Sequence, residues 1–425
     1  MKNLLYLILT AVIISSCGRK STTETSNEDS LIKIDLLTDA DAKVTKLSEI
    51  AKNVEYIPLE TTESSLIGPS VLKVIYTNNR VYLRNSGLNG EILCFDMEGK
   101  FLYKLQNRGR GPEEYTFISD FDVSSDNKFL TILSSSSSKL LTYGISDTGF
   151  SFRKSVTLKD PDPGKVSIVP ETDKAFLAIA PWTGVEPTLS LLINTDGDTI
   201  HFKPNCYKYE RVGTRGYRAT NEMLVYSIGN MVCFKEEFSD TVFYVNAKDN
   251  SFKPRMIFDT HGTSFTPEMR GNPEIPNDHT SLVADIFETS RYVFYSYGSS
   301  ETRKKSIPIE NIIFDKRTNI KYKLDIVTII ETILDNQVEI HINYLKDDLS
   351  GGPDFNMGIN SWSRYCSVGK LFSFVEALTL KQYVNSEDFR NAKVSYPEKK
   401  EELKRLADSL NETDNPVLIV VTPKK

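Results

Sequence analysis

The 425-residue sequence contains few of the residues that hold metals, disulfides or catalytic nucleophiles. It has five Cys and four His, with no Cys-x-x-Cys, His-x-His or His-Glu-x-x-His spacing. So few cysteines exclude a disulfide scaffold, and isolated His residues without these spacings give no basis for a zinc site. No Gly-x-Ser-x-Gly elbow is present, so nucleophilic hydrolysis by serine has no support. We therefore predict no metal and no cofactor.

The sequence also has no excess of positive charge. It carries 51 Lys+Arg against 57 Asp+Glu, a net charge of −6, which gives no electrostatic reason to expect a nucleic-acid partner. With 40% hydrophobic and 25% charged residues the composition is that of a folded protein, and it excludes a largely disordered chain. No stretch after Ile14 approaches membrane-spanning length, so we expect the rest to be soluble and outside the cytoplasm.

The N-terminus has the pattern of an export signal. Leu4 to Ile14 is an apolar run of 11 residues, too short for the roughly 20 that cross a bilayer as a helix. The following Ile-Ser-Ser-Cys sequence resembles a bacterial lipobox, which implies cleavage before Cys17 and lipid attached to it. Several acyl chains would give stable anchoring to a membrane. The alternative is a plain secretory signal that happens to contain a cysteine.

These features divide the chain into three parts. Residues 1–16 are predicted to be a lipoprotein signal peptide. Residues 17–30 are predicted to be a flexible tether, because Gly18 to Ser30 contains no apolar residue and can bury nothing. Residues 31–425 form the predicted globular part.

The globular part repeats a unit of four short β-type runs. The clearest copy consists of Val71–Tyr76, Val81–Arg84, Glu91–Asp96 and Phe101–Leu105, and a second copy between Phe121 and Leu158 aligns with it turn for turn. The first hairpin turn of each unit recurs at intervals of 48, 46, 57, 60 and 79 residues, at Asn79, Asn127, Asp173, Asn230, Ser290 and Gly369. Four strands every 40–60 residues is typical of a β-propeller. A β-sandwich is the alternative, but two sheets do not explain six tandem units.

The sequence therefore predicts an all-β protein, a six-bladed β-propeller with four-stranded blades. The sixth unit is predicted to hold Glu339–Tyr344 and to end near Lys370–Leu380. A short helix at Pro397–Leu410 precedes Val417–Val421, a β-rich run expected to close the ring. Leu31–Leu36 is the strand candidate at the other end of the chain.

Four segments resemble one known family. They are Val54–Thr62 (VEYIPLETT), Gly109–Tyr115 (GRGPEEY), Asp347–Pro353 (DDLSGGP) and Asn415–Val417 (NPV). Together they resemble the six-bladed β-propeller lipoproteins of Bacteroidetes, from about Leu31 to the C-terminus. The resemblance implies a propeller on a lipid anchor, often of unassigned activity. We expect a location in the cell envelope, at the outer membrane, with the periplasmic or surface face left open.

A first candidate ligand site is the GRGPEEY loop between units one and two. In a propeller, connections at this position lie on the face where pore ligands bind. Arg side chains suit an anionic or hydroxyl-rich ligand. The planar guanidinium can form two parallel hydrogen bonds with one carboxylate or phosphate group. The candidates in this loop and in the matching loop between units three and four are Arg108, Arg110, Glu113, Tyr115, Arg215 and Arg218. The alternative is that Arg–Glu pairs only join neighbouring blades.

Two further candidates lie late in the chain. His341 shares one face of a predicted strand with Glu339 and Asn343, which could line the pore, although a lone strand His is more often simply hydrogen-bonded. Asp347 and Asp348, with Asp354, could be paired carboxylates for glycoside or lyase chemistry. Their alternative is a solvated acidic loop with a Gly-Gly-Pro turn.

The functional hypothesis is a lipid-anchored cell-envelope binding module for a glycan or a partner protein. Aromatic residues at Trp182, Trp362, Tyr207 and Tyr217 could stack on sugar rings, although aromatics also pack blades. The alternative is an envelope hydrolase or lyase with its active site at the pore. We favour binding over catalysis, and the only partners we expect are the membrane, reached through the lipid, and the glycan or envelope protein.

Overall fold

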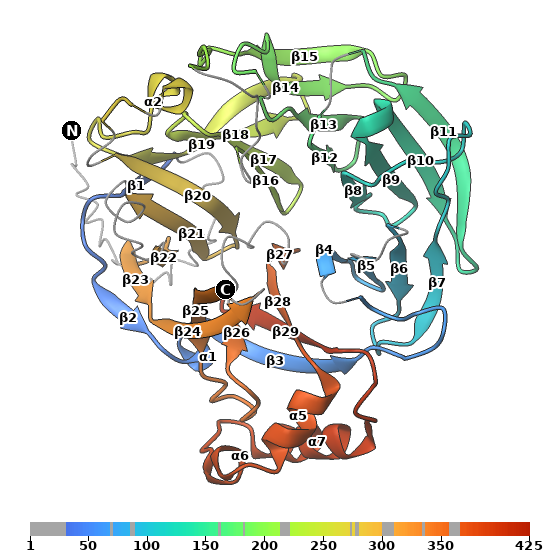
Figure 1. The fold of residues 1–425 in the computed structure, drawn as a ribbon, viewed down its shortest axis with the longest axis vertical. Coiled ribbons are helices and arrows are strands. Elements are labelled where there is room, and N and C mark those ends of the chain that lie inside the picture. Colours follow the sequence, from blue (N-terminus) through green and yellow to red (C-terminus); the bar gives the residue numbers. More distant parts are fainter. Residues whose placement is uncertain are drawn as a thin grey trace, which may run out of the picture. The chain divides into compact units, whose positions relative to one another are not determined.

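The repeated hairpins fold into six β-sheets that stand around a central axis as the blades of a propeller (Figure 1). The computed structural model describes residues 31–68, 71–85, 90–159, 163–181, 183–212, 222–272, 274–276, 280–299, 310–333, 336–356 and 366–425. Side chains are described for these residues except 299, 327–342 and 366. The predicted signal peptide and tether, including Cys17, lie outside the described residues.

Each blade begins with its innermost strand and ends at the rim. Blade one consists of β4 (Val71–Tyr76), β5 (Val81–Asn85), β6 (Ile92–Phe95) and β7 (Phe101–Leu105). Blade two consists of β8 (Asp120–Val123), β9 (Phe129–Ser134), β10 (Lys139–Ile145) and β11 (Phe150–Thr157), with a 3-10 turn, η1, at Ser135–Ser137. Blade three consists of β12 (Lys165–Ile168), β13 (Ala175–Ala178), β14 (Thr188–Ile193) and β15 (Thr199–Pro204).

The second half of the ring follows the same order. Blade four consists of β16 (Met223–Ile228), β17 (Met231–Glu236), β18 (Thr241–Asn246) and β19 (Ser251–Asp259), followed by the short helix α2 (Pro267–Gly271). Blade five consists of β20 (Ser281–Glu288), β21 (Tyr292–Ser299), β22 (Glu310–Asp315) and β23 (Ile320–Leu324). Blade six consists of β27 (Cys366–Ser367), β28 (Lys370–Val375), β29 (Val417–Pro423) and β3 (Ala51–Pro58). The six-bladed, mainly four-stranded prediction is confirmed.

The hairpin turns form where the sequence tolerates positive φ. Asn127, Asn250 and Asn319 adopt φ near +57°, and Gly99 adopts +85°. At Gly99 a side chain is also excluded by packing, because an added Cβ would lie 2.0 Å from the carbonyl oxygen of Pro58. The turn between β6 and β7 therefore packs directly against the end of β3 in the neighbouring blade.

The N-terminal segment is a belt around the outside of three blades. β1 (Ile32–Asp35) adds to blade four parallel to β19, and β2 (Ala42–Val44) adds to blade five parallel to β23. After the short helix α1 (Leu47–Ile50), β3 pairs antiparallel with β29 along its whole length. Figure 1 shows these segments in blue at the rim.

The ring is thus closed by the C-terminal strand, as the sequence predicts, and its partner from the other end of the chain is β3. Leu31–Leu36 does contain a strand, β1, yet β1 covers blade four. β29 is a seven-residue strand with nearly every residue buried, so it needs a long strand on its outer side, and the eight residues of β3 supply it.

Asn415, just before β29, fixes this closure. Its side-chain oxygen accepts a hydrogen bond from the Ile67 N–H at 3.0 Å, and its amide donates to the carbonyls of Glu60 and Ser65, both at 2.9 Å. Its own N–H donates to Thr61 Oγ1 at 2.7 Å. The Asn-Pro and Glu-Thr-Thr segments of the family resemblance therefore meet in space and join the two ends of the chain.

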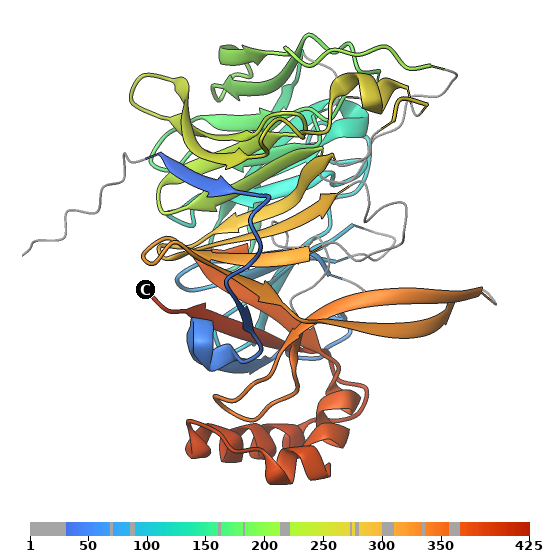
Figure 2. The ribbon, with the colours of Figure 1, turned by 90° about the vertical axis from the view of Figure 1, so that its left-hand side faces the viewer.

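The predicted composition of blade six needs a correction. Glu339–Tyr344 belongs to β25 (Asn336–Leu345), which pairs with β24 (Ile326–Ile333) and at its end with β26 (Phe355–Asn356), in a sheet of its own. The hairpin extends away from the blades in Figure 2. The long 79-residue interval marks this insertion, and local alternation alone could not tell an inserted hairpin from a blade strand.

Between β28 and β29 the chain forms three helices. The predicted helix is confirmed as α7 (Pro397–Ser409), with Leu403 and Ala407 buried on its apolar stripe. Helices α5 (Ala377–Val384) and α6 (Glu387–Asn391) were not predicted, because each is short. None of the helices in the described residues has the length and apolar character needed to cross a membrane.

Candidate functional site

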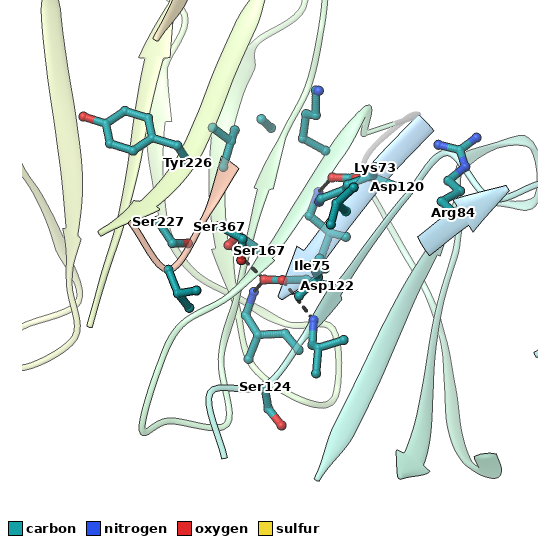
Figure 3. A pocket seen from close by; sticks show the side chains of 18 of the residues that line it. Lys73, Ile75, Arg84, Asp120, Asp122, Ser124, Ser167, Tyr226, Ser227 and Ser367 are labelled. Carbon is teal, nitrogen blue, oxygen red and sulfur yellow. Dashed lines mark hydrogen bonds and ion pairs between the residues drawn. The ribbon is translucent and has the colours of Figure 1, made fainter. Parts of the chain in front are cut away.

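A central cavity of about 750 Å³ lies on the propeller axis. Its walls are the innermost strands of five blades, β4, β8, β12, β16 and β27, with contributions from β5, β13 and the loops that precede β8 and β16. This volume is in the range of pockets that hold small ligands. Polar and charged side chains such as Lys73 and Asp122 lie beside apolar ones such as Ile75 in its lining (Figure 3).

A buried ion pair joins three blades at the end of the cavity where the inner strands begin. Lys73 Nζ of β4 lies 2.9 Å from Asp120 Oδ1 of β8 and also donates to the Phe121 carbonyl at 2.7 Å. The other Asp120 oxygen accepts from the Val166 N–H of β12 at 3.0 Å. Burial favours the neutral form of Asp120, but the charges of Lys73 and Lys165 and these hydrogen bonds outweigh it and lower its pKa.

A second carboxylate, Asp122, faces the same cavity two residues further along β8. Its Oδ2 accepts from Ser167 Oγ at 3.0 Å and from the Ile168 N–H at 2.8 Å, both in β12 (Figure 3). Here burial outweighs the opposing influence of Lys73 and of the backbone donors, and the pKa of Asp122 is raised. Two neighbouring carboxylates therefore have pKa values shifted in opposite directions.

The rim at this end carries an exposed aromatic ring. Phe117, in the connection between β7 and β8, is 56% exposed and lines the cavity. The Arg84 guanidinium of β5 lies over this ring, 5.4 Å from its centre, and donates to the Ser119 carbonyl at 2.8 Å. The opposite end of the cavity is formed by the turns after the inner strands, with uncharged residues such as Asn78, Ser125 and Asn230.

The predicted GRGPEEY loop lies between β7 and β8 as expected, but its residues do not line the cavity. Tyr115 is fully buried and its hydroxyl donates to the Gly90 carbonyl at 3.0 Å, while Tyr143 of β10 donates to the Glu113 carbonyl at 2.7 Å. Arg108 and Arg110 are exposed. The buried contacts connect blade one to blade two, and a ligand-binding role for the Arg side chains stays a prediction.

Several other predicted positions lie apart from the cavity or outside the described residues. Arg215 and Arg218 are outside them, as are the aromatic candidates Trp182, Trp362 and Tyr217; Tyr207 packs near Phe238. His341 is opposite Thr328 in the β24–β25 hairpin, and its strand is not an inner blade strand.

The Asp347–Asp348 pair is the centre of a hydrogen-bonded loop after β25. Asp347, only 2% exposed, accepts from the N–H groups of Leu349 and Gly352 at 3.0 Å, from the Ser350 N–H at 2.9 Å and from the Tyr56 hydroxyl at 2.8 Å. The Ser350 hydroxyl donates to it as well.

Asp348 forms a second link from the same loop to the belt. It accepts from the Ser48 N–H at 2.9 Å and from the Ser48 hydroxyl at 2.6 Å. Neither carboxylate lines the central cavity. The oxygens of the pair thus join this loop to the belt, and whether they also take part in chemistry stays a prediction.

The residues that line the cavity were not predicted from the sequence, although the first strand of each repeat unit contains a pattern that identifies them. Because the inner strands of a propeller line its axis, alternate residues of these strands face the cavity. The Asp-Phe-Asp-Val sequence of β8 puts both carboxylates on one side of the strand, and Lys73 occupies the corresponding strand of blade one. Phe117 had no such signal, because its exposure depends on how the loop folds.

The fold and the cavity define this protein as a six-bladed β-propeller with an axial cavity that polar, charged and apolar residues line. The chain belongs to the family described as "Domain of unknown function (DUF4934)", whose model matches residues 31–422. Within the described residues there is no group of three or more His, Cys, Asp or Glu placed to hold a metal ion.

The chain is similar to two solved structures from Bacteroides. A Bacteroides fragilis protein inferred to be exported is 18% identical, with a TM-score of 0.61 over 93% of this chain and 100% of that chain. A member of the DUF4221 family from Bacteroides vulgatus is 12% identical, with a TM-score of 0.44 over 69% of this chain and 98% of that chain. No curated protein matches the sequence.

Proposed function

We propose that this protein is a lipid-anchored binding module of the cell envelope, whose ligand, a glycan or a segment of a partner protein, enters the central cavity. The observation that carries the proposal is the cavity itself, which presents donors, acceptors and charges from five blades to one space of about 750 Å³. A rigid ring of hydrogen-bonded sheets holds these groups in place before a ligand arrives, which lowers the entropic cost of binding.

The anchor rests on the N-terminal sequence, with a short positive start, an 11-residue apolar run and Ile-Ser-Ser-Cys. The similar Bacteroides fragilis protein is described as exported, which supports this location. We place the protein at the outer membrane. Replacing Cys17 by Ser should move the protein from the membrane fraction to the soluble fraction of the cell envelope, as measured by fractionation and immunoblotting. A variant that stays in the membrane would contradict the anchor.

A bulky side chain in the cavity tests the binding role. Ser227 of β16 is exposed and lines the cavity, so Ser227→Trp should fill part of it without disturbing the core. We expect ligands captured by the full chain from an oligosaccharide array and a peptide library to be lost by this variant. Ser151→Trp, on the exposed rim strand β11, is the matched control and should bind normally. Equal binding by Ser227→Trp would place the ligand elsewhere and overturn the proposal.

The second candidate is an envelope hydrolase or lyase at the pore, favoured by the opposite pKa shifts of Asp120 and Asp122. Against it, both oxygens of Asp120 and Oδ2 of Asp122 accept hydrogen bonds from neighbouring blades, and Oδ1 of Asp122 accepts from the adjacent Val123 N–H. Such a network supports a structural role for the pair. Cleavage of any ligand captured in the screen, detected by mass spectrometry, would favour the enzyme.

A further inference from the structure

An exposed phenyl ring, that of Phe117, lies at the mouth of the central cavity. Phe117 is 56% exposed, although two residues before it Tyr115 is fully buried and bonded to the carbonyls of Gly90 and Leu105. The backbone that carries Phe117 is therefore fixed by blade one.

The guanidinium of Arg84 packs over the Phe117 ring. The Arg84 guanidinium lies 5.4 Å from the ring centre, and its Nη1 donates to the Ser119 carbonyl at 2.8 Å on the same connection. The cation thus occupies one face of the ring, while more than half of the side chain remains accessible. An aromatic face held in one orientation and exposed to solvent is prepared for a flat ligand.

We propose that Phe117 is a stacking platform for a sugar ring and that the ligand of the cavity is a carbohydrate. This inference rests on the proposed binding function and names its ligand class. A pyranose has a face of C–H groups, whose partial positive charge suits the negative face of an aromatic ring. Its edge carries hydroxyls that each donate and accept hydrogen bonds.

The cavity beyond Phe117 meets the second requirement. Lys73 supplies donors, the carboxylates of Asp120 and Asp122 supply acceptors, and Ser227 supplies a hydroxyl that does both. Positive and negative groups are mixed along the wall, which suits a neutral polyhydroxyl ligand better than an ion of either sign. A peptide has no comparable combination of a flat C–H face with hydroxyls around its edge.

The test compares two exposed phenylalanines of similar accessibility. Phe129 of β9 is 44% exposed and does not line the cavity, so Phe129→Ala is the matched control for Phe117→Ala. Titration of the full chain in detergent with oligosaccharides selected on an array should show affinity about tenfold weaker for Phe117→Ala and unchanged for Phe129→Ala. Phe117→Trp should bind at least as well as the parent chain because it keeps an aromatic face, and Phe117→Leu should bind weakly although its side chain is still apolar.

The outcomes separate this inference from the function on which it rests. Equal sugar affinity in the parent, Phe117→Ala and Phe117→Leu chains would overturn the stacking role. Capture of peptides but no oligosaccharide, blocked by Ser227→Trp, would overturn the carbohydrate assignment and leave the binding module standing. If Ser227→Trp blocked the binding of no captured ligand, both the binding function of the cavity and the carbohydrate assignment would be overturned.

Discussion

Asp347→Asn is expected to lower the free energy of unfolding by about 3 kcal/mol, because the carboxylate is buried and accepts five hydrogen bonds. One asparagine atom could still accept from Leu349 and Ser350. The other would turn an N–H₂ group toward the Gly352 N–H, so two donors would face each other, and the Tyr56 and Ser350 hydroxyls would have to rotate to accept from it. The loop has no room to adjust, because an added Cβ at Gly352 would lie 1.9 Å from Tyr56 Oη.

Urea unfolding followed by tryptophan fluorescence and circular dichroism measures this loss. Asp354→Asn is the control, since Asp354 lies in the same loop and is exposed, and it should change stability by less than about 0.5 kcal/mol. If Asp347→Asn were as stable as the control, the carboxylate would not hold the loop to the belt. That result would favour the alternative hypothesis, in which Asp347 is a catalytic carboxylate.

Lys73→Met is expected to cost about 2 kcal/mol at neutral pH and much less in acid. Methionine keeps the apolar stem but removes the charge that holds Asp120 between blades one, two and three. Because the folded-state pKa of Asp120 is lowered, its contribution to stability is present above its unfolded pKa of about 3.9 and is lost as the pH falls through the lower folded value. Without Lys73, burial raises that pKa, so the two proteins should converge in stability at the acidic end.

Thermal unfolding of both chains between pH 2.5 and 7 measures this dependence. Lys104→Met is the matched control, because Lys104 pairs with Glu91 within blade one at 3.3 Å and should cost less than about 1 kcal/mol. The double variant Lys73→Met with Asp120→Asn should lose less than the sum of the single changes. A stability difference that does not change with pH would show that Asp120 is not the group that Lys73 stabilises.

The fold could be predicted because each blade is local in sequence. Strands of one blade follow one another through short turns, so alternation and turn residues such as Asn127 and Gly99 place them without knowledge of distant contacts. The closure was harder, because β29 and β3 lie some 360 residues apart and many apolar runs could pair with a Val-rich strand. Local pattern predicts that a strand exists and does not choose its partner.

The site was less accessible to prediction than the fold. Polar and charged loop residues were chosen as candidates from the sequence. Tyr115 and Asp347 are, however, buried and hydrogen-bonded to backbone groups that no sequence pattern connects to them. The cavity is instead lined by residues from the inner strands of five blades, such as Lys73 and Asp122. Only the ring geometry shows that these strands face one axis.

The carbohydrate-binding role is tested most directly by a crystal structure of the chain with an oligosaccharide selected in the binding screen. We expect density for a sugar ring within the central cavity, with one face against Phe117 and hydroxyls directed toward Lys73 and Asp122. Density at the rim of the blades or on the loop around Asp347, with the central cavity left empty of sugar, would contradict it.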